Sequence, residues 1–145
     1  MAENGVIISF SPIRGVVLYK FSLKPGHSIE VKVFIPEGCK QFAINLGTDE
    51  KNYVLHFNPR FDIFEVKKMI ILNSMVDDVF GEEQRESFFP FQEGSDTTVC
   101  FQFEQDKIII ELPTGNPLSF PVRFPIEEIS YLSVVDLQLK SITLK

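Results

Sequence analysis

Apolar and polar residues alternate with a period of two along several stretches of the chain. The alternation is clearest in 28–35, and it recurs in 41–46 and 98–104. Successive side chains of a β-strand point to opposite faces, so this period predicts strands with one buried face. In 135–144 the alternation changes phase, which predicts a final strand with a bulge near Ser141.

Turn-forming residues separate these segments at short intervals. Gly, Pro, Asn and Asp cluster at 24–26, 36–38, 47–49, 93–96 and 113–117. A turn at Asp106-Lys107 leads from 98–104 into the apolar run 108–110, which predicts a hairpin. Many short strands with this spacing indicate an antiparallel β-sandwich. Only 126–132 suits a turn of helix, so we predict an all-β fold.

The length of the chain predicts one domain. Its 145 residues contain no internal repeat, low-complexity tract or linker. A protein of this size buries roughly two-thirds of its unfolded surface, which is enough for one sizeable core. We therefore expect 1–145 to form a single domain. With 44% hydrophobic and 23% charged residues, the composition excludes a disordered or collagen-like chain.

Charge and hydropathy narrow the range of partners. The net charge is -6, which argues against binding to nucleic acid. The longest apolar runs, such as 70–72 and 108–110, are far shorter than the ~20 residues that span a bilayer, so we expect no membrane insertion. The N-terminus is acidic and lacks the basic and apolar regions of a signal peptide, which predicts a protein whose synthesis ends in the cytoplasm.

The residues that commonly bind metals or form disulfides are sparse. Cys39 and Cys100 lie too far apart for a CxxC motif, and we interpret both as free structural thiols. The chain has two His residues and scattered carboxylates, a pattern without metal-ligand spacing. We expect no metal and no cofactor.

A row of polar residues in 55–61 is the first pattern that indicates a function. His56, Asn58 and Arg60 recur at every second position and would emerge from one face of a strand. An imidazole, an amide and a guanidinium at fixed spacing suit the hydroxyl groups of a small neutral ligand such as a sugar. The alternative is an exposed strand face with three unrelated polar residues, although His, Asn and Pro are poor strand formers.

A second polar pair follows downstream. Glu83 and Arg85 share a face at a spacing of two, and Asn73 lies between this pair and the first row. Glu83 can hold Arg85 and Arg60 through charge-assisted hydrogen bonds, which would fix the donors rigidly. The alternative is a surface ion pair that contributes ~0 to 1 kcal/mol and has no function.

These residues resemble the sugar-binding signature of the galectins, the β-galactoside-binding lectins. The family blocks H-x-N-P-R, V-x-N and W-x-x-E-x-R correspond here to 56–60, 71–73 and 80–85. The similarity continues outside the blocks and covers nearly the full chain, through 23–26, 45–47, 89–92 and 120–124. The combined motif is specific, and the chain resembles the single-domain, prototype galectins.

The resemblance implies a fold and a set of site residues. The fold is a galectin-like and concanavalin-like jelly-roll sandwich of two antiparallel sheets, with the sugar in a groove on one concave face. The carbohydrate-binding positions of the family fall on His56, Asn58, Arg60, Asn73, Phe80, Glu83 and Arg85. The resemblance assigns the first three to the axial 4-hydroxyl and ring oxygen of galactose. It assigns Asn73 and Glu83 to the 6-hydroxyl, and Glu83 and Arg85 to the neighbouring sugar.

The resemblance also implies partners and a location. We expect glycans as ligands, namely β-galactosides such as lactose on glycoproteins or glycolipids. Single-domain galectins often form homodimers, which would crosslink glycans, and the terminal segments 6–10 and 135–144 are candidate interface edges. Galectins commonly leave the cell without a signal peptide, which predicts both a cytoplasmic and an extracellular location.

Two departures from the family pattern concern specificity. Phe80 replaces the Trp that stacks on galactose, and the chain contains no Trp. The smaller ring predicts a loss on the order of 1 kcal/mol, and a relaxed preference that extends to mannose or glucose. The alternative places Val79 and Phe80 in the core. The loop 62–68 is more apolar and more charged than the Gly- and Asn-rich loop of the family, and it borders the groove.

Two other classes of function compete with a lectin. One is a galectin-fold protein that has lost sugar binding and serves a structural or protein-binding role. The other is an enzyme, but the adjacent carboxylates Glu82 and Glu83 would point to opposite faces of a strand, and Arg85 would lower the pKa of Glu83. Neither Cys39 nor Cys100 lies in a motif with His27 or His56 that would indicate a hydrolase. We expect a lectin and no catalytic residue.

Overall fold

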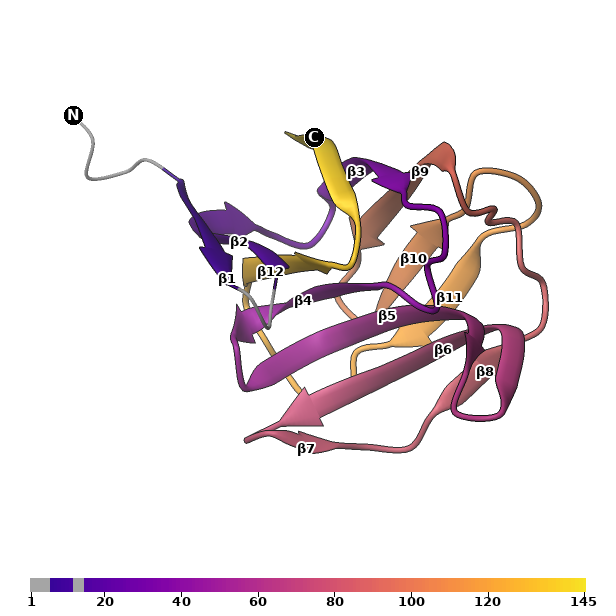
Figure 1. The fold of residues 1–145 in the computed structure, drawn as a ribbon. Helices are drawn as coiled ribbons and strands as arrows, with labels where there is room; N and C mark the ends of the chain where they lie inside the picture. Colours follow the sequence, from indigo (N-terminus) through magenta and orange to yellow (C-terminus); the bar gives the residue numbers. More distant parts are fainter. Residues whose placement is uncertain (1–5, 12–14) are drawn as a thin grey trace.

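The computed structural model describes residues 6–11 and 15–145. Its regular structure consists of strands, and these two segments contain no helix. The strands form two antiparallel sheets that enclose one core as a jelly-roll sandwich (Figure 1). The predicted all-β fold with two antiparallel sheets is confirmed.

The larger sheet has eight strands and carries the polar row. In spatial order they are β1 (Ile7–Ser11), β2 (Gly15–Leu23), β12 (Ile129–Val135), β4 (Ala43–Asp49), β5 (Asn52–Ile63), β6 (Val66–Val76) and β7 (Val79–Phe80), with β8 (Gln84–Glu86) also paired to β6. The strands β7 and β8 pair with the end and the middle of β6, on the edge that β5 leaves open.

The smaller sheet has five strands and closes the other side of the core. In spatial order they are β11 (Leu118–Pro121), β10 (Lys107–Glu111), β9 (Ser95–Phe103), β3 (Ser28–Ile35) and β13 (Gln138–Leu144). The pairing of β9 with β10 confirms the hairpin predicted around Asp106. The strand predicted for 28–35 matches β3 at both ends.

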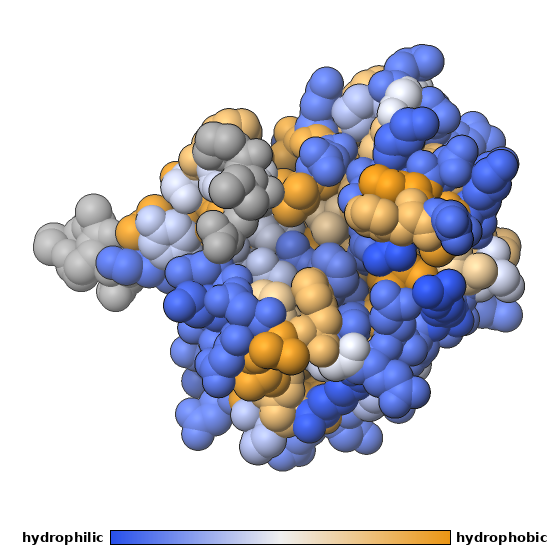
Figure 2. All heavy atoms as spheres, turned by 60° about the horizontal axis from the view of Figure 1, so that its bottom comes forward, coloured by the Kyte–Doolittle hydropathy of each residue, from blue (hydrophilic) through white to orange (hydrophobic). Residues whose placement is uncertain are grey.

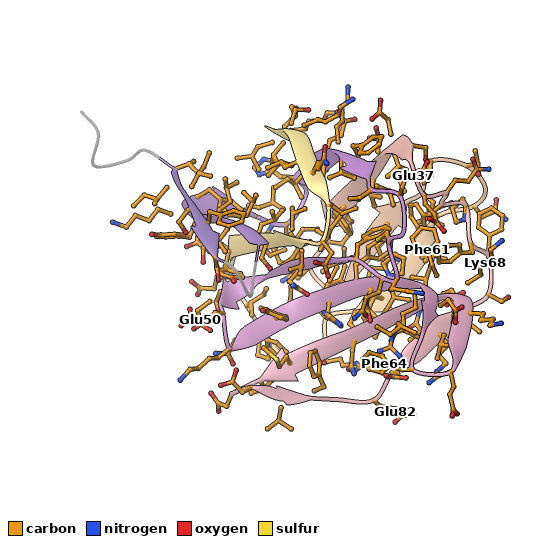
Figure 3. The ribbon with its side chains drawn as sticks, viewed as in Figure 1. Glu37, Glu50, Phe61, Phe64, Lys68 and Glu82 are labelled. Atoms are coloured by element: carbon orange, nitrogen blue, oxygen red, sulfur yellow. The ribbon has the colours of Figure 1, made fainter. Side chains whose placement is uncertain are left out.

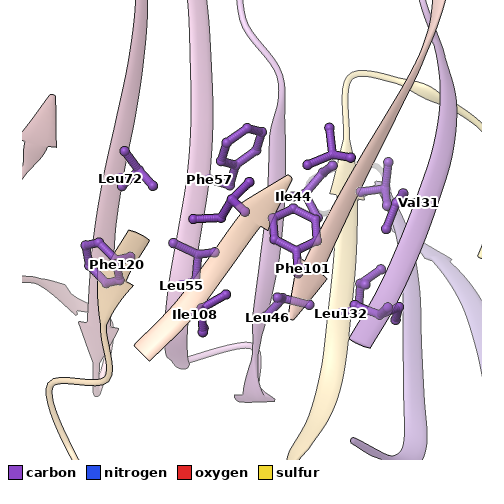
Figure 4. Packing of buried hydrophobic residues seen from close by; sticks show 14 of the residues in the cluster. Val31, Ile44, Leu46, Leu55, Phe57, Leu72, Phe101, Ile108, Phe120 and Leu132 are labelled. Carbon is purple, nitrogen blue, oxygen red and sulfur yellow. The ribbon is translucent and has the colours of Figure 1, made fainter. Parts of the chain in front are cut away.

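Phenylalanine rings and aliphatic side chains fill the space between the sheets. Phe57 of β5 and Phe101 of β9 meet from opposite sheets with ring centroids 5.5 Å apart, and both are fully buried (Figure 4). A phenyl ring needs no hydrogen-bond partner, so Phe fits this dry interior better than Tyr or Trp would. The alternation of β5 thereby presents its polar residues on the outer face of the larger sheet.

One detail of the sequence prediction is wrong and another is confirmed. The segment 126–132 does not form a helical turn, because Ile129 and Leu132 belong to β12 and are buried. A bulge between Ile129 and Tyr131 shifts the register, and the residues from Tyr131 to Val134 are all buried, so burial in this strand does not follow a period of two. The expected bulge near Ser141 is present, between Leu139 and Ser141.

The end of the chain forms two strands where the sequence predicted one. Val135 ends β12 in the larger sheet, and β13 begins at Gln138 in the smaller sheet. Asp136 has a φ of 63°, and this left-handed conformation turns the chain from one sheet to the other. The alternation continues through the turn, so the sequence pattern alone does not reveal the change of sheet.

The strand β1 is the outermost strand of the larger sheet. It pairs with β2 and projects from the sandwich in Figure 1, at the terminal segment 6–10 that was expected to form an edge. Ile8 and Phe10 on β1 are 66% and 77% exposed, because no strand of the smaller sheet covers them.

Candidate functional site

The outer face of β5 holds the predicted polar row. The polar row points away from the core and consists of His56, Asn58 and Arg60. The alternating residues Leu55 and Phe57 point the other way and are fully buried. Cross-strand pairing brings His56 opposite Asn45 of β4 on one side and opposite Asn73 of β6 on the other. The site is therefore built from neighbouring strands of a rigid sheet.

His56 is fixed in one tautomer by a chain of hydrogen bonds. Asn45 donates its side-chain N–H to Ser133 Oγ at 2.9 Å, so its Oδ1 is the acceptor that faces His56 Nδ1 at 2.6 Å. The proton of the neutral imidazole therefore lies on Nδ1. Nε2 keeps its lone pair and can accept a hydrogen bond from a ligand hydroxyl.

The electrostatic environment keeps His56 neutral. Burial of the imidazole and the nearby Arg60 guanidinium lower the pKa of His56 from 6.5 to about 4, although Glu83 opposes the shift. A neutral imidazole at neutral pH suits an uncharged ligand, because its lone pair remains available as an acceptor.

Asn58 and Arg60 form one hydrogen-bonded unit. The Asn58 amide donates to Phe42 O at 2.8 Å and to Gln41 Oε1 at 3.1 Å, and its Oδ1 accepts from Arg60 Nε at 2.9 Å. Asn58 is only 3% exposed, so it mainly orients the Arg60 guanidinium. The Arg60 N–H groups that remain can donate to a ligand.

Glu83 connects the two predicted polar groups. Its carboxylate accepts hydrogen bonds from Arg85 Nε and Nη2 at 3.2 and 3.0 Å, and its other oxygen lies 3.9 Å from Arg60 Nη2. The expected hydrogen bonds between Glu83 and Arg85 are therefore confirmed, whereas Arg60 lies within ion-pair distance of Glu83 but too far for a hydrogen bond. The side chain of Arg85 is 52% exposed, so it is available at the rim of the site.

Asn73 is buried and engaged in the framework of the site. Its Oδ1 accepts from Ser74 N at 2.8 Å and from Arg123 Nη1 at 3.1 Å, and its amide donates to Gly81 O at 2.9 Å. One amide N–H remains for a ligand. Asn73 therefore anchors the segment that links Phe80 to Glu83.

Arg123 is a site residue that the motif analysis did not include. It also donates to Ser74 Oγ at 3.1 Å and to Glu82 O at 2.6 Å, so it ties β6 to the segment after β7. Gly81 permits this contact, because a Cβ there would lie 3.0 Å from Arg123 Nη1. The sequence signal was its place in 120–124, which matches the galectin pattern outside the sugar motif.

Phe80 lies over the site and not in the core. It is 49% exposed, and its ring centroid lies 4.9 Å from that of His56. Val79 is 68% exposed, so the alternative that placed both residues in the core is wrong. The ring stands at the His56 end of the polar row.

An open groove of about 440 Å³ runs over the polar row and Phe80, whereas Glu83 and Arg123 line a separate hollow. The lining of the groove includes Tyr53, His56, Arg60, Phe64 and Phe80. Figure 2 turns this side of the molecule forward and shows hydrophobic atoms exposed within a largely hydrophilic surface. The groove thus combines polar donors and acceptors with apolar rings, a combination that suits a neutral ligand with hydroxyl groups and an apolar face.

Comparisons with known proteins agree with this geometry. The family model of galactoside-binding lectins matches residues 16–144. Galectin-1 of Rhinella arenarum is 48% identical over 129 residues, which cover 89% of this chain and 96% of that protein. The chain therefore belongs to the galactoside-binding lectin family.

Solved structures share the fold. The complex of toad ovary galectin with N-acetylgalactose has a TM-score of 0.89 and 49% identity, and the match covers 90% of this chain and 98% of that one. CG-16, a homodimeric agglutinin from chicken liver, has a TM-score of 0.85 and 35% identity, and the match covers 89% and 98% of the two chains.

In 6–11 and 15–145, no group of three or more His, Cys, Asp or Glu side chains is arranged to hold a metal ion. Within the same residues, no helix is long and apolar enough to cross a membrane. Cys39 and Cys100 are free thiols, and burial raises the pKa of the Cys39 thiol.

Proposed function

We propose that this chain is a β-galactoside-binding lectin and that the groove over β5 is its carbohydrate site. The observation that carries the proposal is the fixed row of His56, Asn58 and Arg60 with neutral His56 at one end. Donors and acceptors held in place before binding lose little conformational freedom when a ligand arrives. The family membership and the sugar complex of the toad galectin support the same assignment.

The proposed roles follow from the hydrogen-bonding capacity that remains. His56 Nε2 accepts from the axial 4-hydroxyl of galactose, and the free Arg60 N–H groups donate to that hydroxyl and to the ring oxygen, while Asn58 Oδ1 holds the guanidinium in place. The remaining Asn73 N–H and the Glu83 carboxylate bond the 6-hydroxyl. Phe80 stacks on the apolar face of galactose.

The charged pair of the site, Glu83 and Arg85, is assigned to the neighbouring sugar. We propose that Glu83 and Arg85 bond the residue attached to galactose in lactose or a related disaccharide, since Arg85 lies exposed at the rim. In this arrangement Glu83 is paired with Arg85 and not with a second carboxylate, and we propose binding without an enzyme activity.

We further propose that residues 1–145 act as one carbohydrate-recognition domain and that two copies form a homodimer. The outer strands β1 and β13 present the candidate edges, and the homodimeric chicken agglutinin supports such an assembly. A homodimer would crosslink glycans on glycoproteins or glycolipids. We propose a cytoplasmic and an extracellular location, with export that needs no signal peptide.

Calorimetric titration of lactose into the purified protein tests the proposal. Arg60→Ala should reduce lactose binding by more than tenfold, because it removes charge-assisted hydrogen bonds that no other residue supplies. Lys140→Ala is the matched control, since Lys140 is a half-exposed cation paired with Asp96 on the smaller sheet. It should bind lactose like the original chain.

The same titration separates the alternatives. Saturable binding of mannose without lactose would show a retuned sugar site and contradict galactoside recognition. No binding of either sugar, or equal binding by Arg60→Ala and the original chain, would contradict the assignment of the groove.

A further inference from the structure

The hairpin that joins β5 to β6 turns on two non-glycine residues. Ile63 pairs with Val66, so Phe64 and Glu65 alone form the turn, with φ values of 53° and 61°. Two-residue hairpin turns of this kind favour Asn-Gly, because both residues adopt positive φ. A bulky aromatic residue at positive φ is an outlier, and such outliers persist where the surrounding structure or a function maintains them.

The turn holds the Phe64 ring at the Arg60 end of the groove. Phe64 is 68% exposed, and Arg60 Cζ lies 5.4 Å from its ring centroid. Phe64 is labelled in Figure 3, in the lower part of the molecule. Since Asn58 and Glu83 already hold Arg60, the ring packs against a guanidinium that is itself fixed.

The polar row therefore has an aromatic ring at each end. Phe80 stands beside His56 and Phe64 beside Arg60. Arg60 lies 3.9 Å from Glu83, which we propose to bond the group attached to galactose. The Phe64 ring beside Arg60 therefore lies on the side of that group, while the Phe80 ring faces galactose. The groove thus has an aromatic surface for each of two linked ligand groups.

We infer that Phe64 is a second stacking platform, which selects β-galactosides whose attached group has an apolar face. That group is the C–H face of a second pyranose or an aromatic aglycone. The inference rests on the proposed function, because it assumes that galactose occupies the Phe80 end of the row. An aromatic contact contributes about 0.5–1.5 kcal/mol, which corresponds to a two- to tenfold change in affinity.

Phe64→Asn tests the inference, because Asn adopts positive φ more readily and removes the ring. Affinities for methyl β-galactoside, phenyl β-galactoside and lactose are measured by calorimetry, together with the thermal midpoint. In the original chain the phenyl galactoside should bind several-fold tighter than the methyl galactoside. In Phe64→Asn the two should bind equally and lactose should weaken two- to tenfold, while the thermal midpoint does not fall.

Two further variants separate the ring from the turn. Phe64→Tyr keeps an aromatic face and should retain the preference for the phenyl galactoside. Glu65→Asn alters the same turn without removing the ring, and it should bind all three ligands like the original chain.

The outcomes distinguish this inference from the proposed function. Equal affinity of the original chain for the methyl and phenyl galactosides, or an unchanged lactose affinity in Phe64→Asn, would overturn the platform alone. An equal loss for all three ligands would show that Phe64 acts only through Arg60, and would also overturn it. If the original chain binds none of the three, the proposed function fails and the inference fails with it.

Discussion

The side chains on the two faces of β5 are held in place by different interactions. On the inner face, Leu55 and Phe57 are fully buried among apolar neighbours from both sheets, and their packing depends on volume and shape. On the outer face, each residue of the polar row is hydrogen-bonded to a neighbouring group: His56 to Asn45, Asn58 to Phe42 O, and Arg60 to Asn58. One strand therefore supports the fold with one face and prepares a binding site with the other.

Mutations on the two faces of β5 should therefore affect different properties of the protein. Hydrophobic packing contributes to stability from the inner face, and a change there should lower the free energy of unfolding without targeting a ligand. The hydrogen bonds of the outer face involve atoms at the edge of a groove, so a change there should affect binding more than stability. Variants of the two faces should therefore separate a loss of stability from a loss of ligand binding.

The largest expected effect lies on the inner face. Phe57→Ala should lower the free energy of unfolding by about 3–5 kcal/mol, because it leaves a cavity at the contact with Phe101. Urea denaturation followed by circular dichroism measures the loss. Val79→Ala, at a 68% exposed site, serves as the control and should change stability by less than about 0.5 kcal/mol. A loss below about 1 kcal/mol for Phe57→Ala would contradict this separation.

A pH experiment tests whether the outer face also contributes to stability. The folded pKa of His56 is about 4 against 6.5 for the free group, so between these values the unfolded chain binds a proton that the folded chain does not. Stability from this source is complete above pH 6.5 and falls by about 3 kcal/mol as the pH drops to 4.

His56→Gln isolates that contribution. Denaturation curves at pH 7 and pH 4 should show a smaller loss of unfolding free energy in His56→Gln than in the original chain, by about 3 kcal/mol. Contributions of the other residues are common to both proteins and cancel in the comparison. Equal losses would show that His56 is not held neutral in the folded state.

Arg123→Ala probes the framework behind the outer face. The change removes hydrogen bonds to Asn73, Ser74 and Glu82 O, so we expect a loss of about 2 kcal/mol in unfolding free energy. Lactose affinity should also fall, because the segment that carries Phe80 and Glu83 loses its anchor. Arg123→Lys should recover part of both losses, and unchanged lactose affinity in Arg123→Ala would exclude a positioning role.

The smallest expected effect concerns the stacking ring. Phe80→Trp should tighten lactose binding by about 1 kcal/mol, or several-fold, because an indole offers a larger apolar surface. Stability should be unaffected, since Phe80 is half exposed. Calorimetric titration measures the change, and an equal or weaker affinity would show that this ring does not contact the sugar.

The sequence predicted what depends on local alternation. The strands at 28–35 and 98–104, the hairpin after the latter and the bulge near Ser141 all follow from the spacing of apolar residues. The same alternation correctly placed His56, Asn58 and Arg60 on one face. These features require no knowledge of distant contacts.

The sequence did not predict what depends on distant partners. Ser133 and Asn45 fix the His56 tautomer, and they lie on strands whose pairing is not visible in a period of two. Arg123 approaches Asn73 from a segment beyond β11 for the same reason. The turn at Asp136 was missed because a single left-handed residue leaves the alternation intact.

The position of β12 in the larger sheet has a consequence for folding. It lies between β2 and β4, so Leu132 pairs with both Leu18 and Leu46, far back along the chain. Closing such long loops is slow, and sandwiches dominated by distant pairings fold in milliseconds to seconds. Until β12 inserts, β2 and β4 each expose an open edge that other chains can pair with. During synthesis, the sheet that carries the site is completed only after β12 has left the ribosome, and the nascent protein is most prone to aggregate before that moment.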